Sequence, residues 1–364
     1  MEHQAGPPDS APSAPTPKLA RSPARRRRNM VGPRVSILLP VFNASETIEA
    51  CLRSILRQTE SNFECVLVDD GSTDDTLERV SDVVGDDARF VVHSISHQGI
   101  VAALNAGLRF CRAPLIARMD ADDLMHRARL ALQARFLHQF PWLSAVGSHV
   151  RLFPRATLGH GYRAYERWLN TMGSDADIRR EAFVECPIAH PTLMIRRPVL
   201  AAVSYRDLGW PEDYDLVLRL LASGHRIGVV PKRLLSWRNG TQRLSRTASA
   251  YRIARFVACK AAFLADGLLD GRDQYVLWGY GPTGRAMFRA LARLGKRPVM
   301  IVEVNPRKVG QVIQGARVVA PEALPSPGAF PVVVAVAGAG PRAIIRHHLD
   351  RAGYQELEHF VCTA

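Results

Sequence analysis

Apolar and polar residues form alternating blocks along the first part of the chain, and these blocks predict strands followed by helices. Val35–Leu39 is a short apolar run that ends at Pro40, which is typical of a buried strand. The next block, SETIEACLRSILRQ, carries its apolar residues at helical spacing and offers Ser45 as a candidate N-cap. Phe63–Val68 then predicts a second strand, and residues 74–84 predict a second helix.

The same alternation continues with a strand in RFVVHSI, a helix in GIVAALNAGLRFC and a fourth strand in LIARM. Strands that alternate with helices in this way are typical of an α/β sheet. Ligands of such sheets bind beyond the carboxyl ends of the strands. Three polar clusters fall at these ends, namely residues 40–43, 69–71 and 120–123. Their convergence on one edge favours a binding site there.

The third cluster is the most unusual, because LIARMDADDLM places three carboxylates within four positions: Asp120, Asp122 and Asp123. One interpretation is a solvated turn, where aspartate is common. The other is a bound cation that holds the charges together. Hard divalent cations such as Mg²⁺ or Mn²⁺ take carboxylate oxygens and often bridge them to phosphates.

A second acidic cluster lies in PEDYDLVLRLLASG, where the apolar stripe predicts a helix and Gly224 follows as a C-cap. Glu212, Asp213 and Asp215 sit in or before its first turn. Acids at that position offset the helix dipole and cap free N–H groups. Alternatively, one of them acts as a general base.

Composition limits the class of protein. The 364 residues suffice for two domains, and 47% of them are hydrophobic, which allows sizeable cores. Six scattered cysteines without a C-x-x-C pair suit a reducing cytosol better than a disulfide framework. The sequence has no run of about 18 apolar residues and no apolar segment typical of a secretory signal. We therefore expect a cytoplasmic protein.

The net charge of +14 leaves two interpretations open for the N-terminal tail, residues 1–33. This segment is rich in Pro, Ala and Ser, carries four consecutive arginines at 25–28, and is expected to be disordered. It is either a solvated tail or a segment whose arginines contact nucleic acid or anionic lipid at the inner face of the membrane. The remaining basic residues lack the aromatic interleaving of a nucleic-acid surface, so no nucleic-acid partner is expected.

The ordered series of motifs resembles a known family. VSILLPVFNASETIEACLRSILRQTESNFECVLVDDGSTDDT, followed by GIVAALNAGL and ARMDADD, resembles the nucleotide-binding half of a family 2 glycosyltransferase with the GT-A fold. HPTLMIRRPVL and WPEDYDLVLRLLASGHRI resemble the acceptor half of that family. The resemblance covers roughly 210 residues and implies a GT-A domain with a mixed sheet over residues 34–245. It also implies metal-dependent, inverting transfer of a sugar from a nucleotide-diphosphate sugar to a glycan or lipid-linked acceptor, in surface polysaccharide synthesis.

The resemblance also assigns roles to the residues of the donor site. It implies that Pro40 and Phe42 lie beside the base, that Asp70 binds the base edge or ribose, and that Asp120 faces the ribose. Asp122 is the implied ligand of Mg²⁺ or Mn²⁺, with Asp123 as a nearby partner. Each has a structural alternative: Pro40 can simply end a strand, Phe42 can be core, and Asp70 can cap a turn.

On the acceptor side, the match to the family's ED motif implies that Asp213 is the general base and Glu212 its orienting partner. Arg238, Arg243 and Arg246 follow in a Gly-containing stretch, LLSWRNGTQRLSRT. Such a loop either closes over the donor diphosphate or is an ordinary basic loop.

Strand–helix alternation restarts after a predicted helical linker at 246–271. QYVLWGYGPTGRAMFRALARLG reads as strand, turn and helix, with Gly279, Gly281 and Gly284 in a G-x-G-x-x-G pattern. Glu303 ends the next strand, where a ribose hydroxyl could bind. Residues 272–364 thus resemble a small Rossmann-like module that binds a nucleotide or CoA. A glycine turn without any ligand is the alternative.

Two other functions remain open at this point. One is a nucleotide-sugar-binding regulatory protein without turnover, which the intact acids Asp120, Asp122 and Asp213 disfavour. The other is an NAD-dependent oxidoreductase acting through the C-terminal module. That module is only about 90 residues long and offers no convincing hydride-transfer constellation.

Overall fold

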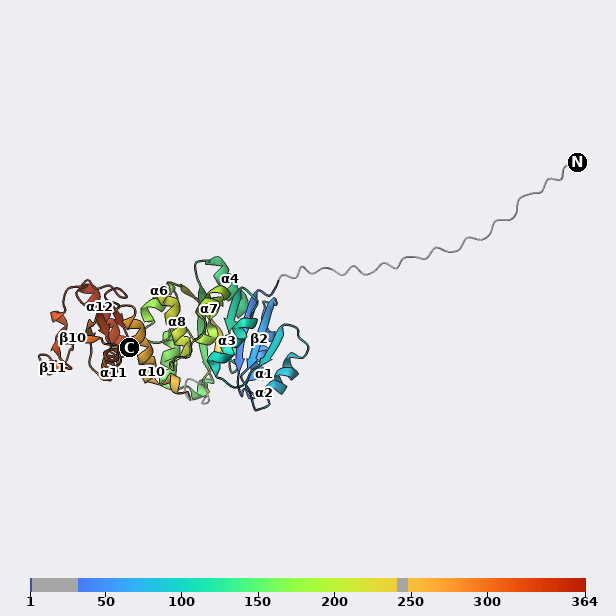
Figure 1. Cartoon of the computed structure of the whole chain (residues 1–364), viewed down its shortest axis with the longest axis horizontal. Coiled ribbons are helices and arrows are strands. Elements are labelled where there is room, and N and C mark those ends of the chain that lie inside the picture. The colour runs from blue at the N-terminus through green and yellow to red at the C-terminus, as the bar shows by residue number, and fades with distance from the viewer. Residues whose placement is uncertain (2–31, 241–247) are drawn as a thin grey trace. The chain divides into compact units, whose positions relative to one another are not determined.

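The computed structural model describes Met1, residues 32–240 and residues 248–364. Residues 33–364 form one compact unit, distinct from residues 1–32 (Figure 1). The four arginines at 25–28, together with Arg243 and Arg246, lie outside the described residues. None of the described helices is long and apolar enough to cross a membrane.

The first four predicted strands are present and lie parallel in the order β3-β2-β1-β4. They span Val35–Val41 (β1), Phe63–Asp69 (β2), Phe90–Ser94 (β3) and Leu115–Arg118 (β4). The connecting helices are Ile48–Leu56 (α1), Thr76–Val84 (α2) and Ile100–Phe110 (α3). Because these strands are parallel, their carboxyl ends share one edge of the sheet.

The prediction of Ser45 as the N-cap of the first helix is wrong. The helix begins at Ile48, and Thr47 precedes it without a side-chain cap. The backbone N–H of Ser45 instead donates to Asp74 at 3.1 Å. Ser45 therefore belongs to a loop that is tied to the next strand–helix connection, and this long-range bond overrides the local capping signal.

Residues 124–238 complete the sheet with four further strands. These are Leu124–Met125 (β5), Ala145–Phe153 (β6), Met194–Arg196 (β7) and Ile227–Arg238 (β8). The full order is β3-β2-β1-β4-β7-β6-β8-β5. β7 runs antiparallel to β4 and β6, and β5 runs antiparallel to β8, so the sheet is mixed, as predicted.

Helices and short 3₁₀ turns cover this second part. The α-helices are Arg129–Gln139 (α4), His160–Leu169 (α5), Asp175–Glu181 (α6), Arg197–Val203 (α7) and Glu212–Ala222 (α8). The 3₁₀ turns of the described chain are Arg155–Thr157 (η1), His190–Thr192 (η2), Ser249–Tyr251 (η3) and Pro321–Ala323 (η4). α8 follows the prediction closely, and Gly224 adopts a positive φ of 79° just beyond its end.

The first sheet is buried on both faces, which explains why its strands are almost continuously apolar. In β1, Ile37 and Leu39 belong to one core cluster, whereas Leu38 belongs to a second one. Alternate side chains of a strand point to opposite faces, so the two clusters lie on either side of the sheet. The polar strand ends are thereby held on a rigid support.

Along one edge of β6, backbone N–H and carbonyl groups form hydrogen bonds with side chains instead of with a neighbouring strand. β6 pairs with β7 only at Ala145 and Val146. Further along that strand, the Asn170 side chain accepts from the N–H of Val150 and donates to its carbonyl, both at 2.9 Å. Glu166 of α5 accepts from the N–H of Leu152 at 3.1 Å. This edge therefore ends the hydrogen-bond ladder.

Residues 274–362 form a second, six-stranded sheet of order β11-β12-β10-β9-β13-β14. Its strands are Gln274–Trp278 (β9), Arg297–Val302 (β10), Val312–Ile313 (β11), Ala316–Val319 (β12), Val332–Val334 (β13) and Phe360–Cys362 (β14). All pairs are parallel except β11 with β12. Its helices are Pro282–Arg293 (α11) and Ala339–Arg351 (α12).

The predicted linker contains the helix Ile253–Ala265 (α10), which belongs to two cores at once. Cys259 is part of a core cluster of the first sheet, whereas Ala261 and Leu264 are part of the cluster under the second sheet. The Lys260 ammonium donates to the carbonyls of Val184 at 2.8 Å and Thr363 at 3.0 Å. α10 is thus an internal connection between the sheets.

Candidate active site

The three carboxylates that follow β4 come together in one turn. One oxygen from each of Asp120, Asp122 and Asp123 lies within 4.8 Å of the others. β4 ends at Arg118 and β5 begins at Leu124, so the three acids lie within the five-residue connection between the two strands. Three hard oxygen donors at this spacing fit a divalent cation such as Mg²⁺ or Mn²⁺. We refer to residues 120–123 as the acidic turn.

Cationic groups brace the acidic turn from two sides. Arg118, which is buried, forms an ion pair with the carboxylate of Asp120. Burial alone would lower the pKa of Arg118, but the attraction of Asp120 outweighs it and the net shift is upward. From the end of β8, Arg238 donates its Nε to the carbonyl of Asp122 and its backbone N–H to the Asp123 carboxylate, both at 2.7 Å. Arg238 therefore shapes the turn.

A second buried arginine lies under the same turn. Arg129 of α4 donates to the carbonyl of Arg118 at 2.8 Å and to the side-chain oxygen of Gln133 at 2.9 Å. Burial lowers the pKa of Arg129 to about 9, while the nearby Asp123 favours its charged form. These contacts fix the strand end from which the acids project.

At the ends of β1 and β2, the predicted nucleotide residues form a separate group. Pro40 is buried in β1, whereas Phe42 is 44% exposed and its ring stacks on His97 with centroids 4.1 Å apart. The buried Asp70 carboxylate accepts from the N–H groups of Gln98 and Gly99, each at 2.8 Å. It also contacts Nδ1 of His97 at 2.8 Å. Asp70 thus holds the loop that presents an aromatic surface.

The two acids that begin α8 differ in their surroundings. Glu212 is buried, accepts a hydrogen bond from the Tyr251 hydroxyl at 2.6 Å and lies 3.9 Å from Nδ1 of His190. Burial raises the pKa of Glu212, and the bond from Tyr251 only partly offsets this. Burial and then the charge of Glu212 raise the pKa of the half-buried Asp213 to about 7. A carboxyl with such a pKa can accept a proton near neutral pH.

The acidic turn and the start of α8 influence each other. The charges of Arg118 and Asp120 act on the pKa of both Glu212 and Asp213, with Arg118 favouring the ionised acids and Asp120 opposing them. The structure therefore brings the predicted metal ligand region and the predicted base into one electrostatic environment.

The third acid of α8 has a structural role. The Asp215 carboxylate is fully buried and accepts from Arg206 at 2.6 Å, from Arg219 at 2.7 Å and from the indole N–H of Trp210 at 3.2 Å. Burial alone would raise the pKa of Asp215, but these hydrogen bonds and ion pairs lower it overall. Asp215 ties the helix to the preceding loop.

The residues predicted for a nucleotide in the C-terminal region lie on the second sheet. Gly279 has a φ of 89°, and a Cβ on Gly284 would meet the Gly279 carbonyl oxygen at 2.0 Å. Gly281 precedes α11 and has open space around it. The Glu303 carboxylate is engaged by Lys308 at 2.8 Å. This group therefore belongs to a different sheet from the acidic turn.

Several residues around the site were not predicted from the sequence. Arg118 pairs with Asp120, Tyr251 binds Glu212, and His97 covers one face of Phe42. Only Arg118 carries a local signal, because a charged residue in the apolar run LIARM calls for a buried partner. The partners of Tyr251 and His97 are distant in sequence.

Comparison with known proteins identifies the family. The sequence of residues 36–203 matches the protein family described as glycosyl transferase family 2. The amylovoran biosynthesis glycosyltransferase AmsE of Erwinia amylovora is 31% identical over 215 residues, which cover 58% of this chain and 78% of that protein. A PGL/p-HBAD biosynthesis glycosyltransferase of Mycobacterium bovis is 37% identical over 210 residues, covering 50% and 79%.

Solved structures share the fold. The structure of S. aureus TarS 1–349 in complex with UDP-GlcNAc superposes with a TM-score of 0.53 at 17% identity, covering 71% of this chain and 72% of that one. The mannosyltransferase PcManGT from Pyrobaculum calidifontis in complex with GDP-Man and Mn²⁺ gives 0.50 at 21% identity, covering 72% and 69%. At these identities the likeness concerns the α/β GT-A fold with its mixed sheet. The family model and the two curated relatives establish that the chain belongs to glycosyl transferase family 2 and is a glycosyltransferase.

Proposed function

We propose that the chain is a metal-dependent, inverting glycosyltransferase that uses a nucleotide-diphosphate sugar as donor. The observation that carries this proposal is the acidic turn, whose three carboxylates lie within 4.8 Å of one another and are braced by Arg118 and Arg238. Asp122 is the proposed principal metal ligand. A divalent cation bound there would neutralise the charge that gathers on the leaving nucleoside diphosphate.

The chain's own residues account for donor binding as follows. Phe42 offers an exposed ring face for the base, beside Pro40. Asp70 orders the loop at 97–99 and is the proposed contact to the base edge or ribose. Asp120, oriented by Arg118, faces the ribose. Structural neighbours in complex with UDP-GlcNAc and with GDP-Man and Mn²⁺ support this type of donor.

Asp213 is the proposed general base. Its raised pKa suits removal of a proton from an acceptor hydroxyl near neutral pH. Attack by that hydroxyl on the anomeric carbon, from the side opposite the leaving diphosphate, inverts the configuration in one displacement. Glu212, fixed by Tyr251, keeps Asp213 partly protonated through its negative charge and orients the beginning of the helix.

The proposed acceptor is a glycan or lipid-linked sugar of surface polysaccharide synthesis. The supporting observation is the kinship with the amylovoran biosynthesis glycosyltransferase of Erwinia amylovora. The regulatory protein and the oxidoreductase considered from the sequence are not proposed, because the chain belongs to a family of glycosyltransferases.

Thermal stabilisation by a panel of UDP-, GDP- and dTDP-sugars, measured with and without Mn²⁺, tests the donor class. We expect one nucleotide series to raise the Tm only when Mn²⁺ is present. A panel in which no nucleotide sugar stabilises the protein, or in which stabilisation is independent of the cation, would contradict the proposal.

We further propose that residues 272–364 are a Rossmann-like module. Support comes from the central position of β9 in a parallel order and from the glycine turn that leads into α11. A nucleotide or CoA at this turn is the finer proposal; Glu303 would first have to leave Lys308 before it could bind a ribose. Calorimetry of the full chain with NAD, ADP and CoA tests it. Gly281→Asp should abolish any such binding and spare Mn²⁺-dependent nucleotide binding.

A further inference from the structure

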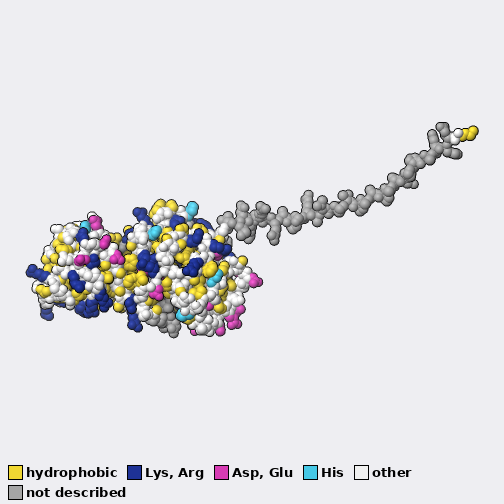
Figure 2. All heavy atoms as spheres, in the orientation of Figure 1, with side chains coloured by type: hydrophobic (Ala, Val, Ile, Leu, Met, Phe, Trp, Pro, Cys, Tyr) yellow, Lys and Arg dark blue, Asp and Glu magenta, His cyan; other side chains and the backbone are white. Residues whose placement is uncertain are grey.

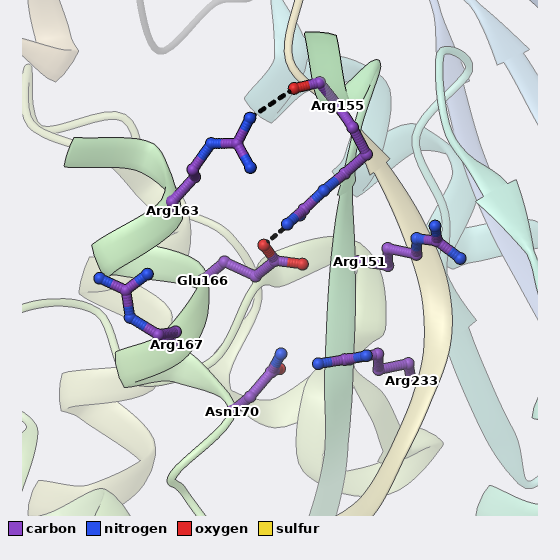
Figure 3. A pocket seen from close by; sticks show the side chains of 7 residues that line it. All are labelled: Arg151, Arg155, Arg163, Glu166, Arg167, Asn170 and Arg233. Atoms are coloured by element: carbon purple, nitrogen blue, oxygen red, sulfur yellow. Dashed lines mark hydrogen bonds and ion pairs between the residues drawn. The ribbon is translucent and has the colours of Figure 1, made fainter. Parts of the chain in front are cut away.

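Five arginines line a hollow that the proposed mechanism does not use. The hollow has a volume of about 550 Å³ and is lined by Arg151, Arg155, Arg163, Arg167 and Arg233 (Figure 3). Glu166 is its single acidic residue, so the lining carries a surplus of four positive charges. Lysine and arginine side chains also lie over much of the face drawn in Figure 2, so positive charge is not confined to this hollow. We refer to these five residues as the arginine pocket.

Two of the five guanidinium groups build the wall of the pocket. Arg155 forms an ion pair with the buried Glu166, and Arg163 donates to the carbonyls of Arg155 at 2.9 Å and Leu158 at 3.1 Å. Figure 3 shows Arg155 reaching toward Glu166 while Arg163 approaches from α5. These bonds preorganise the wall, because neither arginine must give up its partner for a ligand to enter.

The other three guanidinium groups are available. Those of Arg151 on β6, Arg167 on α5 and Arg233 on β8 have no hydrogen bond or ion pair with another residue in the described part of the chain. Their side chains are exposed and converge on one hollow, so they can contact an anionic ligand without first breaking a bond within the protein. Guanidinium groups bind phosphate oxygens in pairs, with a geometry that suits phosphate and diphosphate.

The strand β6, which carries Arg151 of the arginine pocket, is linked to the acidic turn through one side chain. Phe153 pairs with Arg238 in the register of β6 and β8, and the Arg238 guanidinium lies 4.6 Å from the centre of the Phe153 ring. Arg238 is also the residue that braces Asp122 and Asp123. Arg151 and Arg155 of the pocket lie two residues before and two residues after Phe153. The metal site and the pocket are therefore built on the same pair of strands.

We propose that the arginine pocket binds a phosphate or diphosphate group carried by the acceptor, an inference that rests on the proposed glycosyl transfer. Four surplus charges match a diphosphate better than a single carboxylate. The volume falls within the roughly 300–1,000 Å³ of small-molecule sites, so a neighbouring sugar fits as well. A lipid-linked diphosphate acceptor held there would have its sugar end directed along β6 and β8 toward the acidic turn.

The test is calorimetry of the full chain with inorganic pyrophosphate in the presence of a chelator, which removes metal-dependent binding at the acidic turn. Arg151→Gln combined with Arg233→Gln should raise the Kd at least tenfold. Both residues are exposed and hold no other group, so the Tm should stay unchanged. Asp122→Asn should leave pyrophosphate binding intact, which locates it outside the metal site.

A matched control removes the same charge elsewhere. Arg57 and Arg127 line another basic hollow, of about 450 Å³, beside α1 and β5. Arg57→Gln combined with Arg127→Gln should leave the Kd for pyrophosphate within about twofold of the wild type. Equal losses in both double variants would mean a general effect of net charge and would overturn the proposal, as would the absence of pyrophosphate binding in the wild type.

Further probes separate the sources of the anion and the two proposals. Farnesyl diphosphate that binds more tightly than pyrophosphate indicates a lipid-linked ligand, and equal affinity indicates that the diphosphate alone is recognised. If trigalacturonate binds and neither diphosphate does, the pocket is a carboxylate site and the assignment is overturned.

Mn²⁺-dependent binding of UDP and GDP should be unchanged in the Arg151/Arg233 variant. Loss of that nucleotide binding would make the pocket part of the donor site. If the wild type binds pyrophosphate but no nucleotide, the proposed function fails and the anion site stands.

Discussion

Asp122 contributes two different groups to the acidic turn. Its main-chain carbonyl accepts from Arg238, and its carboxylate lies with those of Asp120 and Asp123. We expect Asp122→Asn to preserve the turn, because the carbonyl bond remains, but to weaken Mn²⁺-dependent nucleotide binding and nearly abolish transfer. Calorimetry with UDP or GDP in Mn²⁺ measures the binding. Asp82→Asn, on the exposed side of α2, is the matched control, and unchanged binding in Asp122→Asn would refute the metal assignment.

Asp213 should determine how the transfer rate depends on pH. Its pKa of about 7 means that the fraction of the basic carboxylate grows as the pH rises through that value. We therefore expect kcat/KM to increase up to about pH 7 and to level off above it, within the range where the metal stays bound. Asp213→Asn should lower turnover by roughly 10²–10⁴-fold and remove this inflection. A variant with normal turnover would show that Asp213 is only a helix-terminal acid.

The same carboxyl should also influence stability. A folded-state pKa above the ordinary aspartate value means that the folded protein holds a proton that the unfolded chain has already released. Stability contributed by this group is therefore lost as the pH rises from about 4 to about 7. We expect Asp213→Asn to raise the Tm at pH 8 in chelator and to change it little at pH 4.5, if the wild type remains folded there. Thermal scans at both values measure this, and an equal shift at both would contradict it.

At the scale of single residues, the sequence predicts candidate site residues where the proposed function requires a particular residue type within a short motif. The motifs DADD and PED are enough to indicate Asp120, Asp122 and Asp213. The family's ED motif singles out Asp213, but spacing alone does not separate it from Asp215, which also lies in the first turn of α8, because the surroundings of these two acids depend on distant partners. Asp215 is neutralised by Arg206 and Arg219, whereas Asp213 lies beside Glu212 and has its pKa raised.

At the scale of elements, the turn between β9 and α11 offers two glycines with opposite tolerance. A Cβ at Gly284 would lie 2.0 Å from the carbonyl oxygen of Gly279, and two backbone segments cannot easily separate. Gly281 has a φ of −74° and no neighbour within 4 Å of an added Cβ. We expect Gly284→Ala to lower the free energy of unfolding by about 2 kcal/mol and Gly281→Ala to leave it nearly unchanged. Urea unfolding of both variants decides this, and equal stabilities would contradict the geometry.

Elements with strong local patterns were predictable, and those made by pairing were not. β1, β2 and β4 are apolar runs, and α8 is an amphipathic stripe, so each appears in the sequence alone. β5 has two residues and β7 has three. Strands so short are stable only because β8 and β4 pair with them, and such non-local bonds leave no period in the sequence.

For the molecule as a whole, Glu181 connects the two sheets. It ends α6 beside the first sheet and pairs with Arg346 of α12 at 2.7 Å, where both side chains are buried. We expect Glu181→Gln to lower the free energy of unfolding by about 2 kcal/mol, less than for an isolated buried pair because Glu356 still contacts Arg346. Calorimetry should show a broadened transition as the sheets lose coupling. The exposed Glu322→Gln is the control, and a variant as stable and cooperative as the wild type would refute the coupling.

This connection also bears on how independent the two proposed sites are. Their proposed sites lie on different sheets, yet α10 and Glu181 contact both structural halves. Hydrophobic periodicity could place a helix at 253–265, but it could not reveal that residues of that helix enter different cores.

The side-chain hydrogen bonds along the edge of β6 that β7 leaves uncovered also affect whether the protein aggregates. An open strand edge offers N–H and carbonyl groups to any extended segment of another chain, and it is a common start of aggregation. Here Asn170 and Glu166 already occupy Val150 and Leu152, so an incoming strand finds no ladder to extend. The short β7 covers only two residues of β6. The side chains of Asn170 and Glu166 cover part of the remaining edge and thereby prevent a second molecule from pairing with it.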